Sequence, residues 1–300
     1  MSYHAGLIQR VSIRVLTLGA VFFAVPLAIG AQPLPTPKDF VANLDVRCYK
    51  TGGQPPLNLP LRLDQLNPAF GADVAFQQVV VQEDEEMCLP VYKNGIPPPS
   101  TVLPFMQYVD WSCYRIDGGV SLDLPLRLDH LNPNIGPPLN NRIDVVVKEP
   151  QQLCLPVRKD AQVIPPDVLK LIQWLDVECF RVETAQPTSP TPLTLHHLNP
   201  LFAGLSESVT VPPASNPYPT QLCVPVMKNL QGPSDDLLEL VRYSDVLCYQ
   251  VEGFQFDHFI RLSQLNPVIT AMGVRPQKVI PLASTKVCLP VAKNGFFPPG

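Results

Sequence analysis

Three short phrases recur four times in the same order along this chain, and together they use all eight cysteines. Each copy opens on an aspartate that precedes a cysteine and an aromatic residue, continues through Leu-Asn-Pro, and closes on Cys-Leu/Val-Pro-Val-x-Lys. The opening aspartates are Asp45, Asp110, Asp176 and Asp245, and the closing cysteines are Cys88, Cys154, Cys223 and Cys288. Such self-similarity predicts four structural repeats, at residues 36–98, 99–164, 165–232 and 233–300.

The spacing of the cysteines indicates how the repeats meet. The two cysteines of one copy are 40, 41, 44 and 40 residues apart, whereas 25 residues separate the copies at each of the three junctions. A flexible linker would tolerate insertions, so a junction of constant length predicts repeats that pack against one another. They can stack as a rod or close into a ring, and a ring would bring the first and fourth copies together.

The first 31 residues have the plan of a secretory signal peptide. Arg10 and Arg14 precede an uncharged apolar run at residues 15–29, and small residues follow it. The run is too short for a membrane span, which needs about 20 apolar residues. We therefore predict cleavage near residue 31 and a secreted protein (periplasmic, cell-surface or extracellular) without a membrane span.

The remaining composition predicts an all-β fold with minor helical turns. The chain holds 37 prolines, which oppose long helices. Apolar segments before each opening phrase follow helix-start residues in the third and fourth copies, so we expect a turn or two of helix at 40–44, 105–109, 171–175 and 240–244. Alternating runs such as 61–63, β-branched segments such as 79–81 and the cysteine phrases themselves predict strands, and Leu-Asn-Pro and Lys-Asn-Gly predict turns. We place the closing Cys-x-Pro-Val strand at a sheet edge because its proline lacks a ladder donor.

A repeat of about 65 residues is marginally stable alone and would benefit from a cross-link within itself. A disulfide closing about 41 residues contributes roughly 4 kcal/mol in the chain-entropy model, and such bonds persist outside the cytoplasm. We therefore favour the pairs Cys48–Cys88, Cys113–Cys154, Cys179–Cys223 and Cys248–Cys288. A rival scheme joins Cys88–Cys113, Cys154–Cys179 and Cys223–Cys248 across the junctions, and sequence alone leaves both schemes open.

Charge and motif content point away from several functions. The net charge is −4, and loss of Arg10 and Arg14 would make it −6, so no nucleic-acid partner is indicated. Zinc-ribbon or haem cysteine motifs, phosphate loops and catalytic triads cannot be picked out, so we predict no metal, no cofactor and no catalytic residue. The acidic run at 83–86 is interpreted as a solvated turn, with a calcium site as the alternative.

Either glutamine or histidine occupies the position before Leu-Asn-Pro, which holds Gln65, His130, His197 and Gln264. A position that accepts either residue type suggests a side chain that hydrogen-bonds the turn rather than a catalytic base. His196 and His197 are adjacent, and neighbours on a strand face opposite sides, which disfavours a shared metal.

Aspartate and lysine recur at the two ends of every copy. Because four identical active sites in one chain would be unusual, we predict that Asp45, Asp110, Asp176 and Asp245 are structural. We further predict ion pairs with the closing lysines, which are Lys93, Lys159, Lys228 and Lys293.

Three copies carry an aromatic residue in the segment before the opening phrase, at Tyr108, Trp174 and Tyr243. Regularly spaced aromatic rings can form a stacking platform for sugars. The competing interpretation is that they wedge into the junctions between repeats, as large aromatic side chains usually pack.

The opening Asp-x-x-Cys-Tyr, the polar-Gln-Leu middle and the closing Leu-Cys-x-Pro-Val-x-Lys-Asn-Gly resemble an uncharacterised repeat domain of secreted bacterial proteins, a domain of unknown function. The resemblance covers nearly all of the chain after residue 31. The middle departs from it, with leucine and Asn-Pro in place of an aromatic residue and glycine, and the third copy, like the second, has histidine in place of the glutamine. The resemblance implies export and β-rich repeats, and it brings no activity or catalytic residue.

These observations together predict a secreted, non-catalytic β-repeat protein with a binding or structural role at the cell exterior. Its partner would be a cell-surface or extracellular polymer. The alternative is an exported hydrolase that uses a cleft between repeats. Residues that break the repeat around a pocket would favour the enzyme, and a row of equivalent exposed aromatic residues would favour binding.

Overall fold

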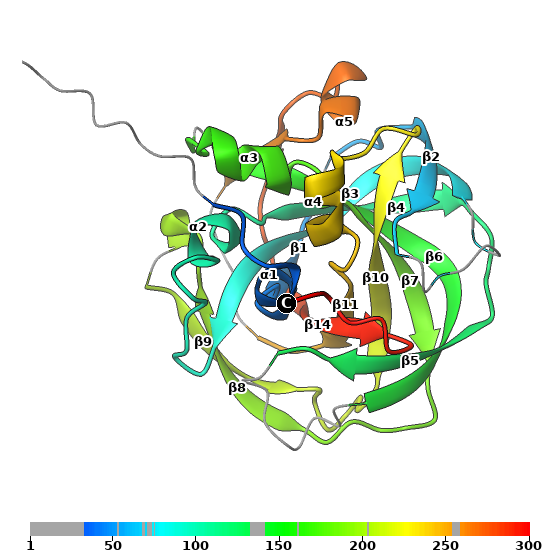
Figure 1. Cartoon of the computed structure of the whole chain (residues 1–300), viewed down its shortest axis with the longest axis vertical. Coiled ribbons are helices and arrows are strands. Elements are labelled where there is room, and N and C mark those ends of the chain that lie inside the picture. The colour runs from blue at the N-terminus through cyan, green and yellow to red at the C-terminus, as the bar shows by residue number, and fades with distance from the viewer. Residues whose placement is uncertain are drawn as a thin grey trace, which may run out of the picture. The chain divides into compact units, whose positions relative to one another are not determined.

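Figure 1 shows the computed structural model of the chain, which describes residues 33–52, 54–67, 70, 74, 76–132, 142–160, 162–202, 204–253 and 259–300. The leader predicted at residues 1–31 lies outside this part of the chain. The described residues belong to one unit, Gln32–Gly300. Within them, no helix has the length and apolar character that crossing a membrane requires.

Short helices begin the repeats, as predicted. They are α1 (Pro37–Ala42), α2 (Leu103–Met106), α3 (Pro166–Ile172) and α4 (Asp235–Val241). In α1 the side chain of Thr36 accepts a hydrogen bond from the backbone N–H of Asp39 at 3.1 Å, and Pro37 occupies a first-turn position that needs no donor. The helices end earlier than the predicted segments, because the last few residues before each aspartate form turns.

Three strand segments follow each helix, in the order that the sequence predicts. The first strands are β1 (Val46–Lys50), β4 (Trp111–Gly118), β7 (Val177–Glu183) and β11 (Val246–Gln250). The second strands are β2 (Leu59–Gln65), β5 (Leu124–His130), β8 (Thr191–His197) and β12 (Ile260–Gln264). In the first two repeats the third strand is one long strand, β3 (Phe76–Lys93) or β6 (Arg142–Lys159). In the third repeat it is divided into β9 (Ser206–Val211) and β10 (Pro219–Lys228), and in the fourth into β13 (Gln277–Val279) and β14 (Ser284–Lys293). A 3₁₀ turn (Pro200–Phe202) and α5 (Pro267–Ala271) follow β8 and β12.

The repeats close into a ring, which decides between the two predicted arrangements. First and third strands alternate in the antiparallel order β1-β3-β4-β6-β7-β10-β11-β14, and β14 of the fourth repeat pairs with β1 of the first. Each strand pair inside a repeat is therefore followed by a pair across a junction. The constant 25-residue spacing follows from this alternation, because an insertion at a junction would shift the register of the next pair.

The disulfides lie inside the ring. The four bonds join Cys48–Cys88, Cys113–Cys154, Cys179–Cys223 and Cys248–Cys288, as predicted, and each links residues directly opposite on paired strands. Neighbouring disulfides also touch, since Cys88 Sγ lies 3.7 Å from Cys113 Sγ across the first junction. All eight cysteines pack in one core cluster with the helices α1 to α4, which gather over one end of the ring (Figure 1).

The predicted edge position of the closing proline is wrong, because its strand has neighbours on both sides. β3 pairs with β1 on one side, and on the other it pairs with β4 up to Cys88 and with β8 from Val91 onward. Pro90 thus falls in the gap between two partners, where the ladder needs no donor. β6 repeats this pattern at Pro156.

The second strands cover the ring from outside. Each pairs with the third segment of its own repeat and with the end of the third segment two repeats away: β2 with β10, β5 with β14, β8 with β3 and β12 with β6. Outward-facing side chains of the ring are buried under them, as where Tyr49 and Leu89 pack with Phe202 and Ile260. The two faces of the ring wall therefore differ: the second strands cover the outer face, and the inner face encloses the interior of the ring, which we call the lumen and which the cysteine cluster fills at the end nearest the helices.

Candidate functional site

The recurring aspartates and lysines form the predicted ion pairs. They join Asp45 to Lys93, Asp110 to Lys159, Asp176 to Lys228 and Asp245 to Lys293, and all eight side chains are buried. Burial raises the pKa of Asp176 to about 6 and lowers the pKa of Lys228, and the attraction between the two charges opposes both shifts. These charged groups therefore neutralise one another inside the protein and are not accessible to a ligand.

An asparagine from another repeat completes each ion pair. The Leu-Asn-Pro asparagines donate from Nδ2 to carboxylate Oδ2, at 2.6–3.0 Å: Asn132 to Asp45, Asn199 to Asp110, Asn266 to Asp176 and Asn67 to Asp245. In three of the pairs the lysine contacts the other oxygen, whereas Asp176 Oδ2 contacts both Asn266 and Lys228. Every repeat thus donates to its predecessor, and the first donates to the fourth. The three recurring phrases meet at these four points, which explains why they recur together.

We predicted that the side chain before Leu-Asn-Pro hydrogen-bonds the turn, and this prediction is wrong. The side chain instead contacts a tyrosine hydroxyl two repeats away. His197 lies 2.9 Å from the hydroxyl of Tyr49, His130 lies 3.0 Å from that of Tyr249, and Gln264 donates to that of Tyr114. Burial, followed by the charge of Lys93, lowers the pKa of His130 to about 4, so its ring is neutral at pH 7. The tyrosines are outward-facing residues of the ring, which sequence period alone could not pair with these partners.

The third repeat has phenylalanine in place of that tyrosine, and a buried glutamate substitutes for the missing hydroxyl. Phe180 cannot accept a hydrogen bond, and Gln65 donates instead to Glu178 Oε2 at 2.7 Å. Glu178 is fully buried, and burial raises its pKa to about 8. Its other oxygen, Oε1, and Gln65 Oε1 are both buried without a hydrogen-bond partner.

The acidic run at 83–86 lies inside β3, so its interpretation as a solvated turn is wrong. Asp84 is buried and accepts hydrogen bonds of 2.5 Å from the hydroxyls of Thr51 and Ser112, and burial raises its pKa to about 6. Glu86 is also buried, and it points into the ring. The described residues contain no group of three or more metal-ligating side chains, so the calcium alternative gains no support from them.

Four polar side chains at equivalent positions of the four repeats meet inside the ring. Glu86, Gln152, Gln221 and Lys286 each stand two residues before a closing cysteine, and we call them the lumen quartet. Alternation along a strand places them on the same inner face as the cysteines, one layer farther from the helices. All four are less than one-tenth exposed, at 6–8 %.

The ammonium group of Lys286 lies at the centre of the quartet. It is 2.5 Å from Glu86 Oε2, donates to Gln152 Oε1 at 2.9 Å and also donates to Gln221 Oε1. Burial disfavours the charge of Glu86, but the attraction of Lys286 and a 2.6 Å hydrogen bond from Thr285 hold its pKa below the usual glutamate value. One positive and one negative charge are thus neutralised where the four repeats converge.

The quartet forms the floor of a cavity of about 430 Å³, which we call the lumen cup. Its walls are Gln151, Arg181, Val182, Pro219, Thr220, Gln250 and Thr285. A neighbouring hollow of about 380 Å³ shares Glu86, Gln152 and Thr285 and extends to Thr51 and Asp84. The lumen quartet therefore places different residue types at four equivalent positions. Its side chains are largely buried but line a cavity that solvent can reach.

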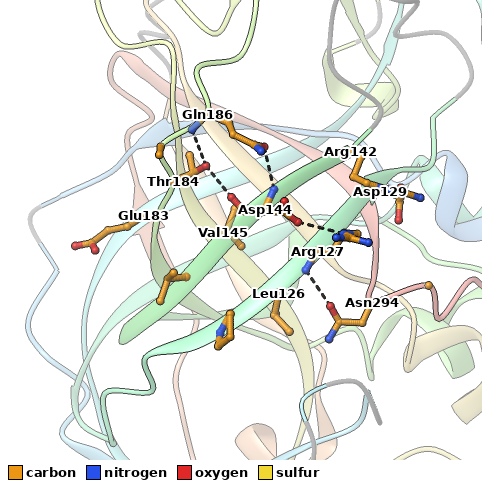
Figure 2. Close-up of a pocket in the computed structure, with 14 residues that line it drawn as sticks. Leu126, Arg127, Asp129, Arg142, Asp144, Val145, Glu183, Thr184, Gln186 and Asn294 are labelled. Carbon is orange, nitrogen blue, oxygen red and sulfur yellow. Dashed lines mark hydrogen bonds and ion pairs between the residues drawn. The ribbon is translucent and has the colours of Figure 1, made fainter.

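Figure 2 shows a larger groove, of about 670 Å³, to which three repeats contribute. Arg127 pairs with Asp144 at 3.2 Å, and Arg142 pairs with Asp129 at 2.9 Å. Gln186 Oε1 accepts a hydrogen bond from the backbone N–H of Asp144 at 3.2 Å, so the loop after β7 is tied to β6. Both arginines and Asp144 are more than half exposed, and exposed pairs of this kind are solvated and contribute little. We therefore favour the lumen cup as the functional site.

The predicted stacking residues do not lie at the lumen cup. Tyr108, Trp174 and Tyr243 are half-buried and pack against the cluster of helices and cysteines. Trp174 also lines a hollow between α3 and α4 with Leu237 and Ser234. Their role as a sugar platform stays a prediction. His196 stacks on Tyr92, with 4.8 Å between ring centroids, on the strand face opposite to His197.

Comparisons with known proteins add no relative. No family model matches this chain, and neither a curated protein nor a solved structure is similar to it.

Proposed function

We propose that this chain is an exported, non-catalytic binding protein whose disulfide-linked ring presents the lumen cup to a ligand. The leader-like residues 1–31 and four disulfides support export to an oxidising compartment, the periplasm or the cell exterior. We also retain the resemblance to secreted bacterial repeat domains as part of this proposal. The partner would be a component of the cell surface or the surrounding medium.

One observation carries the proposal: the recurring charged groups are used in internal pairs, whereas the lumen quartet differs among repeats at the floor of an open cavity. Removing one partner of an invariant pair would leave a buried charge uncompensated, so these pairs are assigned to the scaffold. The lumen quartet is also internally paired, but its residue types differ among four equivalent positions, and departures from a regular pattern concentrate at functional sites. The variation of the quartet is therefore attributed to ligand recognition.

The test separates binding from the alternative of hydrolysis. Purified, oxidised protein is incubated with chromogenic ester, peptide, glycoside and phosphate substrates, and its amide NMR spectrum is recorded with soluble saccharides, peptides and polyamines. We expect no turnover, and shifts confined to lumen-cup signals with one of these classes. Turnover, or shifts away from the cup with every class, would overturn the proposal.

A further inference from the structure

We infer that the lumen cup binds a neutral saccharide, such as the terminal ring of a glycan; this inference rests on the proposed binding function. Most of the residues that line the cup carry amide or hydroxyl groups. Four glutamines contribute amides, at positions 151, 152, 221 and 250, and two threonines contribute hydroxyls, at positions 220 and 285. Val182 and Pro219 are the apolar residues of this described lining, and the carbon atoms of the longer side chains add apolar surface on which a sugar ring can pack.

The charges of the cup are already paired, which disfavours a charged ligand. Lys286 is held by Glu86 at 2.5 Å, and Arg181 is held by Glu149 and Glu183 at 2.5 Å each. An anion would have to compete with carboxylates already in place, and a cation would have to compete with Lys286 for Glu86. A neutral ligand requires neither exchange.

Glutamine amides match the hydroxyl groups of a sugar ring. Each amide offers a carbonyl acceptor and two N–H donors, and each sugar hydroxyl both donates and accepts. Two of these amides are held in place before binding: Lys286 fixes both carbonyl oxygens, while the amide nitrogen of Gln152 donates to Glu85 at 2.6 Å and that of Gln221 donates to Gln151 at 2.7 Å. Fixed polar groups reduce the ordering cost of binding.

The volume of the cup agrees with this ligand class. A cavity of about 430 Å³ lies toward the small end of ligand sites, of about 300–1,000 Å³, which suits one or two sugar rings. The wall of the cup includes the exposed Gln250, whose Oε1 accepts a hydrogen bond from Asn216 at 3.1 Å. That contact leaves the amide nitrogen of Gln250 available to a ligand.

The experiment titrates the oxidised protein with glucose, N-acetylglucosamine and trehalose, and in parallel with glucosamine, glucuronic acid and trialanine. Side-chain amide signals of Gln151, Gln221 and Gln250 are followed by NMR. At least one neutral sugar is expected to shift these signals, and both charged sugars are expected to bind at least fivefold more weakly. Gln250→Ala should weaken binding at least fivefold, whereas Gln186→Ala, in the groove of Figure 2, should not change it.

The outcomes distinguish this inference from the proposed function. If trialanine or a charged sugar shifts the cup signals and the neutral sugars do not, the inferred ligand class is wrong, whereas the lumen cup remains a binding site. If the sugars shift signals around Gln186 instead, the location is wrong. If no probe of any class shifts the cup signals, both proposals are overturned.

Discussion

At the residue scale, Glu178 shows how one repeat compensates for a missing hydroxyl. Protonation of Glu178 would satisfy both unpartnered oxygens at once, because an acid–amide pair with Gln65 makes two hydrogen bonds, one in each direction. The raised pKa, about 8, gives the protonated form at neutral pH. We therefore assign Glu178 as a neutral, structural carboxyl group rather than a catalytic base.

This assignment has a consequence for the dependence of stability on pH. The folded pKa is above the unfolded value, so the contribution of Glu178 is fully present below about pH 4.5 and is lost as the pH rises through 8. Glu178→Gln keeps the paired geometry without a titrating proton. Urea unfolding should show the variant gaining on the wild type by about 3 kcal/mol between pH 4 and pH 7. Exposed Glu252→Gln is the control, and an equal, flat difference for both variants would contradict the assignment.

The buried ion pairs give a second test at this scale. Asp176→Ala or Lys228→Ala alone leaves a buried charge without its partner and should cost about 3–5 kcal/mol of unfolding free energy. The double variant should cost less than the sum of the two, by 1 kcal/mol or more in a double-mutant cycle. The exposed pair Asp167–Lys170 is the control, with a coupling of about 0.5 kcal/mol. Additive losses at the buried pair would show that Asp176 and Lys228 act independently.

At the scale of elements, the turn after each closing lysine fastens a second strand to the repeat two positions away. Asn229, at φ 50°, accepts a hydrogen bond from the backbone N–H of Arg62 at 3.0 Å, and in the second repeat Asp160 does the same for Arg261. Asparagine and aspartate tolerate this left-handed backbone and supply the acceptor as well.

The natural aspartate in the second repeat provides a matched control for this turn. Asn229→Ala should cost about 2 kcal/mol, from the left-handed backbone and the lost hydrogen bond together. Asn229→Asp should stay within about 0.5 kcal/mol of the wild type, because it restores the arrangement of Asp160. Urea unfolding of both variants checks this, and equal losses would show that the acceptor does not matter.

Short-range sequence patterns predict the helices and strands, but they do not predict which side chains of different repeats contact one another. Helix starts, strand alternation and turn residues depend on near neighbours, and they predict the type and order of the elements, although the helices lie a few residues earlier than predicted. The position of Pro90 depends on where one neighbouring strand gives way to another, and the acidic run at 83–86 depends on what covers it. The lumen quartet does not stand out in the sequence, because its residue types differ among the repeats. Counting back two residues from each closing cysteine would have found it, since these positions face the lumen together.

At the scale of the whole molecule, the disulfides form a continuous belt rather than four isolated bonds. Sulfur atoms of neighbouring bonds are 3.7 Å apart at Cys154 and Cys179 and 3.9 Å apart at Cys223 and Cys248. The rival pairing scheme across the junctions is thus close in space, although the structure pairs cysteines within each repeat. A single free thiol in the belt would touch a neighbouring disulfide.

Cys113→Ala creates such a thiol at Cys154. We expect its thiolate to attack Cys179, which forms a Cys154–Cys179 bond and releases Cys223 as the new thiol. Peptide mapping without reduction, after incubation at pH 8, should recover this cross-junction linkage. The control Cys113→Ala/Cys154→Ala should keep its three original bonds. A single variant that retains a free Cys154 after hours would show that the belt does not permit exchange.

Every site described here depends on a closed ring, which requires contact between the first and fourth repeats. In an isotope-labelled, oxidised sample, nuclear Overhauser effects between β1 and β14 report this contact. In a closed ring we expect cross-strand effects linking Val46 to Cys288 and Arg47 to Val287, alongside those from β1 to β3. If β1 shows effects to β3 and none to β14, the repeats form an open array, and the lumen with its quartet does not exist.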